Sequence, residues 1–258
     1  MSNFDRNAPV WGAGRAQQTS AVEMDQGLRS FMLGVYNNMT IGLAITGLAA
    51  IGISMLAIAG VSPTGKVTAL TSLGQALYLS PLKWVVMLAP LAFILFFSFK
   101  AESMSSSAAR AMFFAFAAVM GVSLSSIFVV YTGESITKVF FITAATFGAL
   151  SLYGYTTKKS LSAMGSFLIM GLIGLVIASV VNIFLQSSAL SFAVSAIGVL
   201  VFAGLTAWDT QRLKDMYLYS DMDAESAAKL SVNGALSLYL NFINMFQMLL
   251  SLFGSKQE

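Results

Sequence analysis

One acidic residue, Asp209, lies inside an otherwise apolar run, in the segment VFAGLTAWDTQRLK at 201–214. A carboxylate within a hydrophobic span is energetically costly, and in membrane proteins such residues commonly line ion paths or proton relays. Arg212 follows three residues later and can bend back towards the carboxylate, which is a purely local solution. A second alternative is that Asp209 simply reaches water at the interface. The residue type therefore predicts either an ion site or an interfacial acid.

A second polar feature recurs at steps of three or four residues in the last apolar segment. Its members are Asn233, Ser237, Asn241, Asn244, Gln247 and Ser251. This spacing places them on one face of a helix. Amides in hydrocarbon need hydrogen-bond partners, so we expect this face to look into the protein or a wet cavity and not into lipid. Two interpretations stay open: interhelical packing, or the lining of a polar pathway.

The composition excludes several kinds of chemistry. The chain has no Cys and no His, which excludes disulfides, thiol nucleophiles, Cys/His zinc sites and haem held by His. An intramembrane aspartyl protease needs two carboxylates in one site, and Asp209 has no second one within the apolar runs. We find no catalytic constellation and expect no enzymatic activity and no tightly bound cofactor. The modest net charge of +3 suggests no nucleic-acid partner.

The elements that must position these residues are membrane-spanning helices. The chain is 57% hydrophobic and only 10% charged, whereas soluble domains are about 25% charged. The apolar runs are about twenty residues long, which is the length that crosses the hydrocarbon core of a bilayer. We predict an all-α integral membrane protein and not a barrel, whose strands would alternate in hydropathy. Seven spans are expected, at about 32–60, 82–100, 108–130, 136–156, 164–186, 190–211 and 231–253.

The remaining segments are too polar to cross a membrane. Residues 1–30 predict a flexible cytoplasmic N-terminal tail, residues 31–254 a single seven-helix transmembrane domain, and residues 255–258 a short external C-terminal tail. The segment 61–81 predicts an external loop with a short surface helix.

The distribution of Lys and Arg predicts the orientation. With a cytoplasmic N-terminus, ten basic residues fall on the inside and four on the outside. Cytoplasmic loops of membrane proteins carry such an excess. The C-terminus is then external, and Asp209 lies towards the cytoplasmic end of the sixth span. Lys100, at the cytoplasmic end of the second span, lies at a comparable depth and is a candidate cross-helix partner for the carboxylate.

Four separated blocks of the sequence, in this order, resemble the Bax inhibitor-1 family (the bacterial YccA/YetJ-like branch, related to the eukaryotic TMBIM proteins). The blocks are GVSLSSIFVVYTGESI at 121–136, TFGALSLYGYTTKKSLSAMG at 146–165, FAGLTAWDTQRLK at 202–214 and LSLYLNFINMFQMLLSLFG at 236–254. The resemblance covers almost the whole chain after the tail. It implies a fold of seven transmembrane helices in which the last is central and surrounded by the other six.

The resemblance also implies a pH-sensitive calcium leak. In that mechanism an aspartate on the sixth helix and one on the seventh share a hydrogen bond at the cytoplasmic end of the pore, and a basic residue of the second helix latches onto them. Asp209 matches the sixth-helix aspartate, and Lys100 falls roughly where the latch is expected. The seventh-helix aspartate falls on Asn241, so the chain departs from the family at the residue that makes the pH sensor.

This departure has a physical consequence. Two carboxylates in contact hold one proton between them, whereas an amide can donate to a single carboxylate and favour its charged form. We therefore expect Asp209 to stay ionised at neutral pH, paired with Lys100, and any pore to respond weakly to pH.

The resulting expectation is a cation leak channel of the bacterial inner (plasma) membrane, with calcium as the ion. Its gate and pathway would be formed by Asp209, Asn241, Lys100, Asn244, Asn233, Gln247 and Arg212. Asp209 is the one candidate ligand, for weak and transient Ca²⁺ binding, because one carboxylate with amides is too poor a site for tight binding. The alternative is a regulatory protein that modulates the membrane protease FtsH, with which the resemblance associates bacterial relatives.

Overall fold

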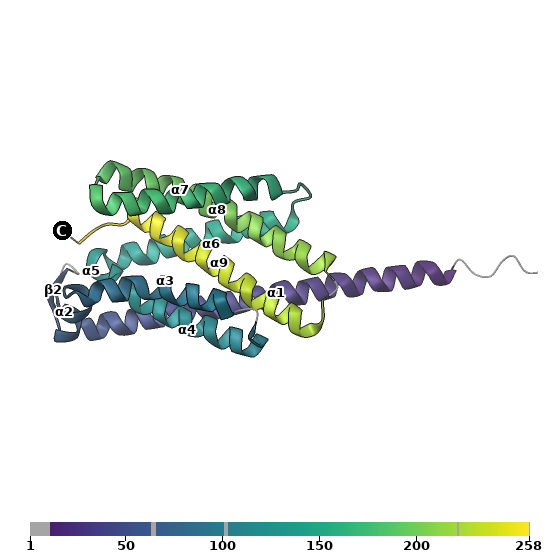
Figure 1. Cartoon of the computed structure of the whole chain (residues 1–258), viewed down its shortest axis with the longest axis horizontal. Helices are drawn as coiled ribbons and strands as arrows, with labels where there is room; N and C mark the ends of the chain where they lie inside the picture. Colours follow the sequence, from purple (N-terminus) through teal and green to yellow (C-terminus); the bar gives the residue numbers. More distant parts are fainter. Residues whose placement is uncertain (1–10, 63–65, 101–102, 221, 258) are drawn as a thin grey trace, which may run out of the picture.

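The computed structural model describes residues 11–62, 66–100, 103–220 and 222–257, with side chains from Met24 onward. Within this part of the chain, seven helices are long and apolar enough to cross a membrane, which confirms the predicted all-helical membrane fold. They lie side by side in an elongated bundle (Figure 1). The helices are α1 (Trp11–Ala57), α3 (Leu82–Lys100), α4 (Ser106–Leu124), α6 (Gly133–Thr156), α7 (Ser162–Leu185), α8 (Ser188–Tyr219) and α9 (Ala224–Phe253).

The first helix differs from the sequence-based expectation. We predicted a boundary near residue 30 between a tail and the first span, but α1 is continuous from Trp11 to Ala57. It runs past the ends of its neighbours at its N-terminal end (Figure 1). Residues 1–10 of the predicted tail lie outside the described residues.

The predicted external loop contains more structure than expected. Strands β1 (Ile58–Val61) and β2 (Val67–Leu70) pair as an antiparallel hairpin, and α2 (Ser72–Tyr78) is the expected short helix. The one-turn helix α5 (Ile127–Val130) follows α4 at the same end of the bundle. Gly74, in the first turn of α2, lies directly against the backbone of Ala57, where a side chain would not fit.

The last helix, α9, holds the central position that we expected. It packs against α1, α4, α6 and α8, and it is the most buried of the seven spans. Its Tyr239 is fully buried between the edges of the rings of Phe113 and Phe116. The Tyr239 hydroxyl bonds the Thr46 hydroxyl at 2.7 Å, and Thr46 also donates to the carbonyl of Ala117. One hydroxyl pair thus joins α1, α4 and α9 in the core.

Polar groups inside the bundle are paired. Every buried side-chain nitrogen or oxygen in the described residues has a hydrogen-bond partner, as the lack of water in a bilayer core requires. Several helices begin at a side chain that caps their first turn. These capping residues are Ser105, Thr132, Ser187 and Asp223.

Candidate functional site

Asp209 lies on α8 and faces α9. Its side chain is 8% exposed. The Nδ2 atom of Asn241 donates to its Oδ2 atom at a distance of 2.7 Å. The family resemblance placed these two residues opposite each other, and the structure brings them into contact. The contact is between a carboxylate and an amide, so no second carboxylate opposes the charge of Asp209.

The expected pairing of Asp209 with Lys100 is wrong. No ion pair joins them in the described residues, and Lys100 is exposed at the end of α3. The reason is the position of α3, which packs mainly on α2 and α4 and does not carry its end to α8. The charge that acts on Asp209 is that of Arg212, whose guanidinium lies 5.3 Å from the ring centroid of Trp208. No ion pair joins Arg212 and Asp209 in the described residues either, so the partner of the carboxylate is the Asn241 amide.

Four consecutive residues of α8, Trp208 to Gln211, each contact a different part of the molecule. Trp208 packs its indole over Gly165 of α7, and Asp209 binds α9. Gln211 binds the α6–α7 connection, because its Oε1 accepts from Leu161 N at 2.7 Å and its Nε2 donates to the Lys159 carbonyl at 2.9 Å. This segment fixes the position of the carboxylate relative to three neighbouring helices.

The fourth member, Thr210, ends a chain of hydroxyl groups that crosses the bundle. Thr210 donates to its own helix at the Thr206 carbonyl. The Ser151 hydroxyl of α6 lies 3.0 Å from Thr210, and the Tyr36 hydroxyl of α1 lies 2.7 Å from Ser151. Because the Thr210 proton is directed to the carbonyl, Ser151 donates to Thr210 and Tyr36 to Ser151. Sequence reasoning missed this chain, although three polar residues in a row, DTQ, within an apolar helix were the available signal.

Glycine allows the close approach of α6 to α8. A methyl group at Gly154 would overlap the backbone of Ala207, two residues before Asp209. Backbone cannot move aside as a flexible side chain does, so this contact requires glycine. Asp209 thus lies on α8 close to the point where α6 packs directly against the α8 backbone.

Most of the polar stripe of α9 is exposed, and only part of it is buried. Asn241 is buried, Asn244 is partly covered, and the other members, Asn233, Ser237, Gln247 and Ser251, are exposed. In Figure 1, α9 crosses the bundle with α7 and α8 on one side and α3 and α4 on the other. Because α7 packs on α8 and α3 on α4, neither covers this face.

Part of the stripe lines a groove beside Asp209. The groove has a volume of about 520 Å³ and lies between α7, α8 and α9. Its polar lining is formed by Ser179, Asp209, Ser237, Asn241 and Asn244. A second cavity of about 280 Å³ contains Gln247 together with Lys83 and Tyr78. Asn233 lines neither cavity.

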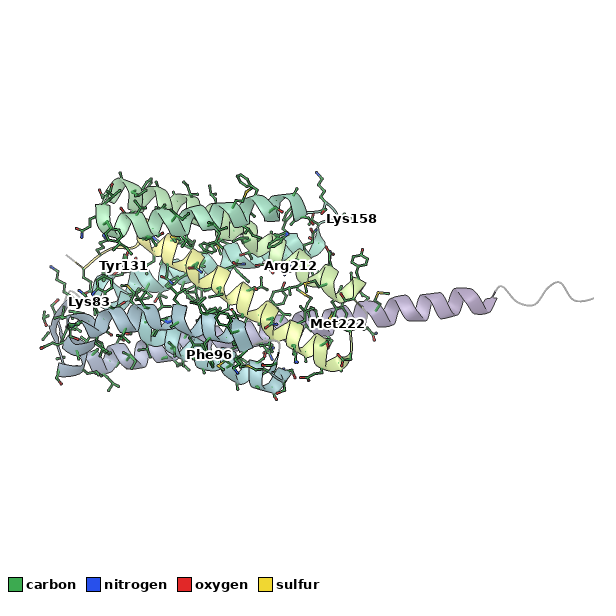
Figure 2. The ribbon with its side chains drawn as sticks, in the orientation of Figure 1. Lys83, Phe96, Tyr131, Lys158, Arg212 and Met222 are labelled. Carbon is green, nitrogen blue, oxygen red and sulfur yellow. The ribbon has the colours of Figure 1, made fainter. Side chains whose placement is uncertain are left out.

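The groove runs along α7 from Ile169 to Ile183, whereas the second cavity lies with Lys83 at one end of the bundle. Figure 2 shows Arg212 in the half that ends in Lys158 and Met222, with Lys83 and Tyr131 at the other end. The described residues contain no group of three or more His, Cys, Asp or Glu side chains that could hold a metal ion. Asp209 therefore acts as a single carboxylate among amide and hydroxyl groups.

Comparison with known proteins identifies the relatives of the chain. Residues 28–258 match the family model described as inhibitor of apoptosis-promoting Bax1. An uncharacterized protein of Caulobacter vibrioides is 44% identical over 260 residues, which cover 100% of both chains. An uncharacterized protein of Rickettsia prowazekii is 45% identical over 91% of this chain and 93% of its own. The inner membrane protein YbhL of Escherichia coli is 42% identical over 92% of this chain and 97% of its own.

Proposed function

Because the chain belongs to the Bax inhibitor-1 family of multi-pass membrane proteins, we propose that it is a cation leak channel whose pathway passes Asp209. Calcium is the ion that we assign to it. The observation that carries this proposal is the Asp209 carboxylate, bound by Asn241 and lying in the wall of a groove with further amide and hydroxyl groups. We further propose that the protein has no enzymatic activity.

The chemistry of the groove suits a hard cation that passes through. Oxygen ligands are those that Ca²⁺ prefers, and tight calcium sites use several carboxylates and carbonyls. A single carboxylate with neutral partners attracts a cation without holding it. Conduction requires such weak binding, because an ion must also leave its site.

The polar stripe supplies the route between the two ends of the bundle. Ser237, Asn241 and Asn244 line the groove beside Asp209, and Gln247 lies three residues after Asn244 in the second cavity. Exposed amides are unfavourable in lipid hydrocarbon, so water along this face is the natural surrounding for them. A hydrated stripe would connect the two cavities.

The location follows from the relatives and from the basic residues. YbhL is an inner membrane protein, and we propose the same membrane for this chain. The excess of Lys and Arg in the segments at the Asp209 end supports a cytoplasmic location for that end and for the N-terminus. The C-terminus is then external.

The decisive experiment is calcium flux into liposomes that contain the purified protein. We expect flux above empty liposomes for the wild type and a strong loss for Asp209→Ala. Asp215→Ala is the matched control, because it removes a carboxylate from the same helix six residues later without touching Asn241. Flux that is equal in all three proteins, or no flux from folded wild type, would overturn the proposal.

A second candidate function is modulation of the membrane protease FtsH. The observation that favours it is the extension of α1 beyond the bundle (Figure 1), which offers a protease a segment to engage. Removal of residues 1–23 tests it, because the truncation ends before Leu28, the first core residue among the side chains that the structure describes. A leak survives this truncation, whereas association with the protease is lost. Copurification with FtsH that is the same with and without the segment contradicts this candidate.

A further inference from the structure

A groove between α1 and α6 is lined by no residue of the polar stripe and takes no part in the proposed ion pathway. Its volume is about 590 Å³. Its apolar wall is formed by Leu33 of α1 and by Phe147 and Leu152 of α6. Leu33 and Leu152 are 59% and 63% exposed, so the groove opens to the surroundings of the bundle, which in a membrane are the lipid chains. Its apolar lining suits an acyl chain.

One end of this groove is cationic. Arg29 lines it and is exposed, and it has no hydrogen-bond or ion-pair partner in the described residues. Asp25 lies one turn earlier on the same helix face, but no ion pair forms between them. Arg29 is therefore a charged side chain at the mouth of an apolar groove with its donors free.

A second cation lies at the same end. The Nζ atom of Lys214 donates to the carbonyl of Tyr155 at 2.8 Å and lies 5.8 Å from the centroid of the Tyr155 ring. Tyr155 lines the groove. An ammonium group has three N–H donors, and the carbonyl takes one of them. Two more remain for an anion bound beside Tyr155.

The cationic end lies at the depth of lipid headgroups. Helix α6 ends at Thr156, one residue beyond Tyr155, and Lys158 follows at the end of the bundle (Figure 2). Phe147 lies eight residues before Tyr155, which is about 12 Å deeper along the helix axis. The groove thus has a polar end at the interface and an apolar wall below it.

We propose that this groove binds one anionic phospholipid. Its phosphate contacts Arg29 and the free donors of Lys214, and one acyl chain lies along Leu33, Phe147 and Leu152. Basic pockets between transmembrane helices recognise anionic headgroups in this way. The floor of the groove is formed by Tyr36 and Ser151, which bond to each other at 2.7 Å. The bound lipid would therefore lie against the hydroxyl chain that ends at Thr210, the neighbour of Asp209.

Native mass spectrometry of the intact protein, titrated with phosphatidylglycerol or phosphatidylcholine, tests the headgroup. We expect retained phosphatidylglycerol in preference to phosphatidylcholine, and about fivefold weaker retention in Arg29→Gln, the factor that one basic side chain contributes near anionic lipid. Arg110→Gln is the matched control, because Arg110 is an exposed arginine at the same end of the bundle that does not line this groove. Equal retention of the two lipids, or no difference between the two variants, would overturn the proposal.

A second variant tests the acyl-chain part of the site. Gly148 lines the groove, and a Cβ atom placed there meets no other atom within 4 Å. Gly148→Phe therefore adds a ring at an open position in the wall of the groove and should abolish retention. Gly174→Phe adds the same ring at an equally open position on α7 and should leave retention unchanged. Retention that survives Gly148→Phe, or that free inorganic phosphate abolishes, contradicts a lipid in this groove.

Discussion

The amide of Asn241 on α9 donates to the carboxylate of Asp209 on α8, with 2.7 Å between Nδ2 and Oδ2. An amide supplies this hydrogen bond at every pH, because it neither gains nor loses a proton near neutrality. A carboxylate at the same place would need to share a proton with Asp209. In the proposed leak, the identity of this one residue therefore decides whether a proton-sharing carboxylate pair lies beside the ion path.

Replacing Asn241 by Asp should introduce strong pH dependence into the proposed leak. Two carboxylates in contact titrate as a pair and hold one proton between them. We expect calcium flux of Asn241→Asp in liposomes to change steeply when it is measured from about pH 5 to about pH 8, because one pKa of a contacting carboxylate pair is strongly raised, and wild-type flux to change little. A flux profile that is the same in both proteins would contradict this role for Asn241.

Replacing Asn241 by Leu should destabilise the fold, because Asp209 then loses the donor that satisfies its charge. Leaving a buried group without its partner costs about 1–3 kcal/mol. Asn244→Leu is the matched control, since its amide bonds only the Leu240 carbonyl of its own helix, at 2.8 Å. The free energy of unfolding in detergent micelles, measured for both variants, checks the prediction. Equal losses of unfolding free energy in the two variants would show that the hydrogen bond to Asp209 stabilises the fold no more than the bond of Asn244 to its own helix.

Much of the fold could be predicted from the sequence, because apolar length is a direct physical requirement of a bilayer. The seven spans followed from runs of about twenty apolar residues. The facing of Asp209 and Asn241 followed from the family resemblance. That Asp209 and Lys100 form no ion pair in the described residues could not be predicted, because it depends on where α3 packs, and hydropathy does not specify which helices are neighbours.

The exposure of the α9 stripe could not be predicted from the spacing of its residues either. A spacing of three or four residues shows that Asn233 and Gln247 share a face, but it does not show what covers that face. The contacts of Gln211 with the α6–α7 connection were missed for a similar reason, since they join backbone groups 50 and 52 residues away. Nor does sequence alone distinguish Gly154 from Gly148. An added Cβ atom would overlap the backbone of Ala207 at Gly154, whereas at Gly148 it would meet no atom within 4 Å.

This difference between the two glycines of α6 gives a stability prediction. Gly154→Ala should destabilise the protein by about 1–3 kcal/mol, because the added methyl group forces the backbones of α6 and α8 apart. Gly148→Ala places the same methyl group in open space on the same helix and should leave stability unchanged or slightly raised. Denaturant titration in micelles compares them. Similar stability of the two variants would mean that the α6–α8 contact at Ala207 is looser than described.

The C-terminal segment should hold the opposite end of the bundle together. The side chain of Gln257 accepts from Val67 N at 2.9 Å and donates to the carbonyls of Phe128 and Tyr131. It thereby joins the β1–β2 hairpin to the turn before α6. The predicted external tail at 255–258 is thus a bonded segment as far as Gln257.

Gln257→Ala should therefore loosen the hairpin. Removing these hydrogen bonds, which are worth about 1 kcal/mol each, should raise the rate of amide hydrogen exchange in β2. Lys256→Ala is the control, because Lys256 is exposed and pairs with Tyr131 through its backbone. Unchanged exchange in Gln257→Ala would show that the hairpin is held by its own pairing.

Outside the membrane spans, Asp223 should make the start of α9 sensitive to acid. Hydrogen bonds from the Ser226 side chain and backbone N–H lower the pKa of Asp223 from its ordinary value of 3.8. A lowered pKa means that the cap contributes fully above pH 3.8 and that its contribution is lost as the pH falls further, through the pKa of the folded state. Asn also caps helices well but does not titrate, so Asp223→Asn should remove this acid sensitivity. Hydrogen exchange of the first-turn amides, compared between the two proteins at each pH, measures it. Equal acid sensitivity in both would assign the effect to another group.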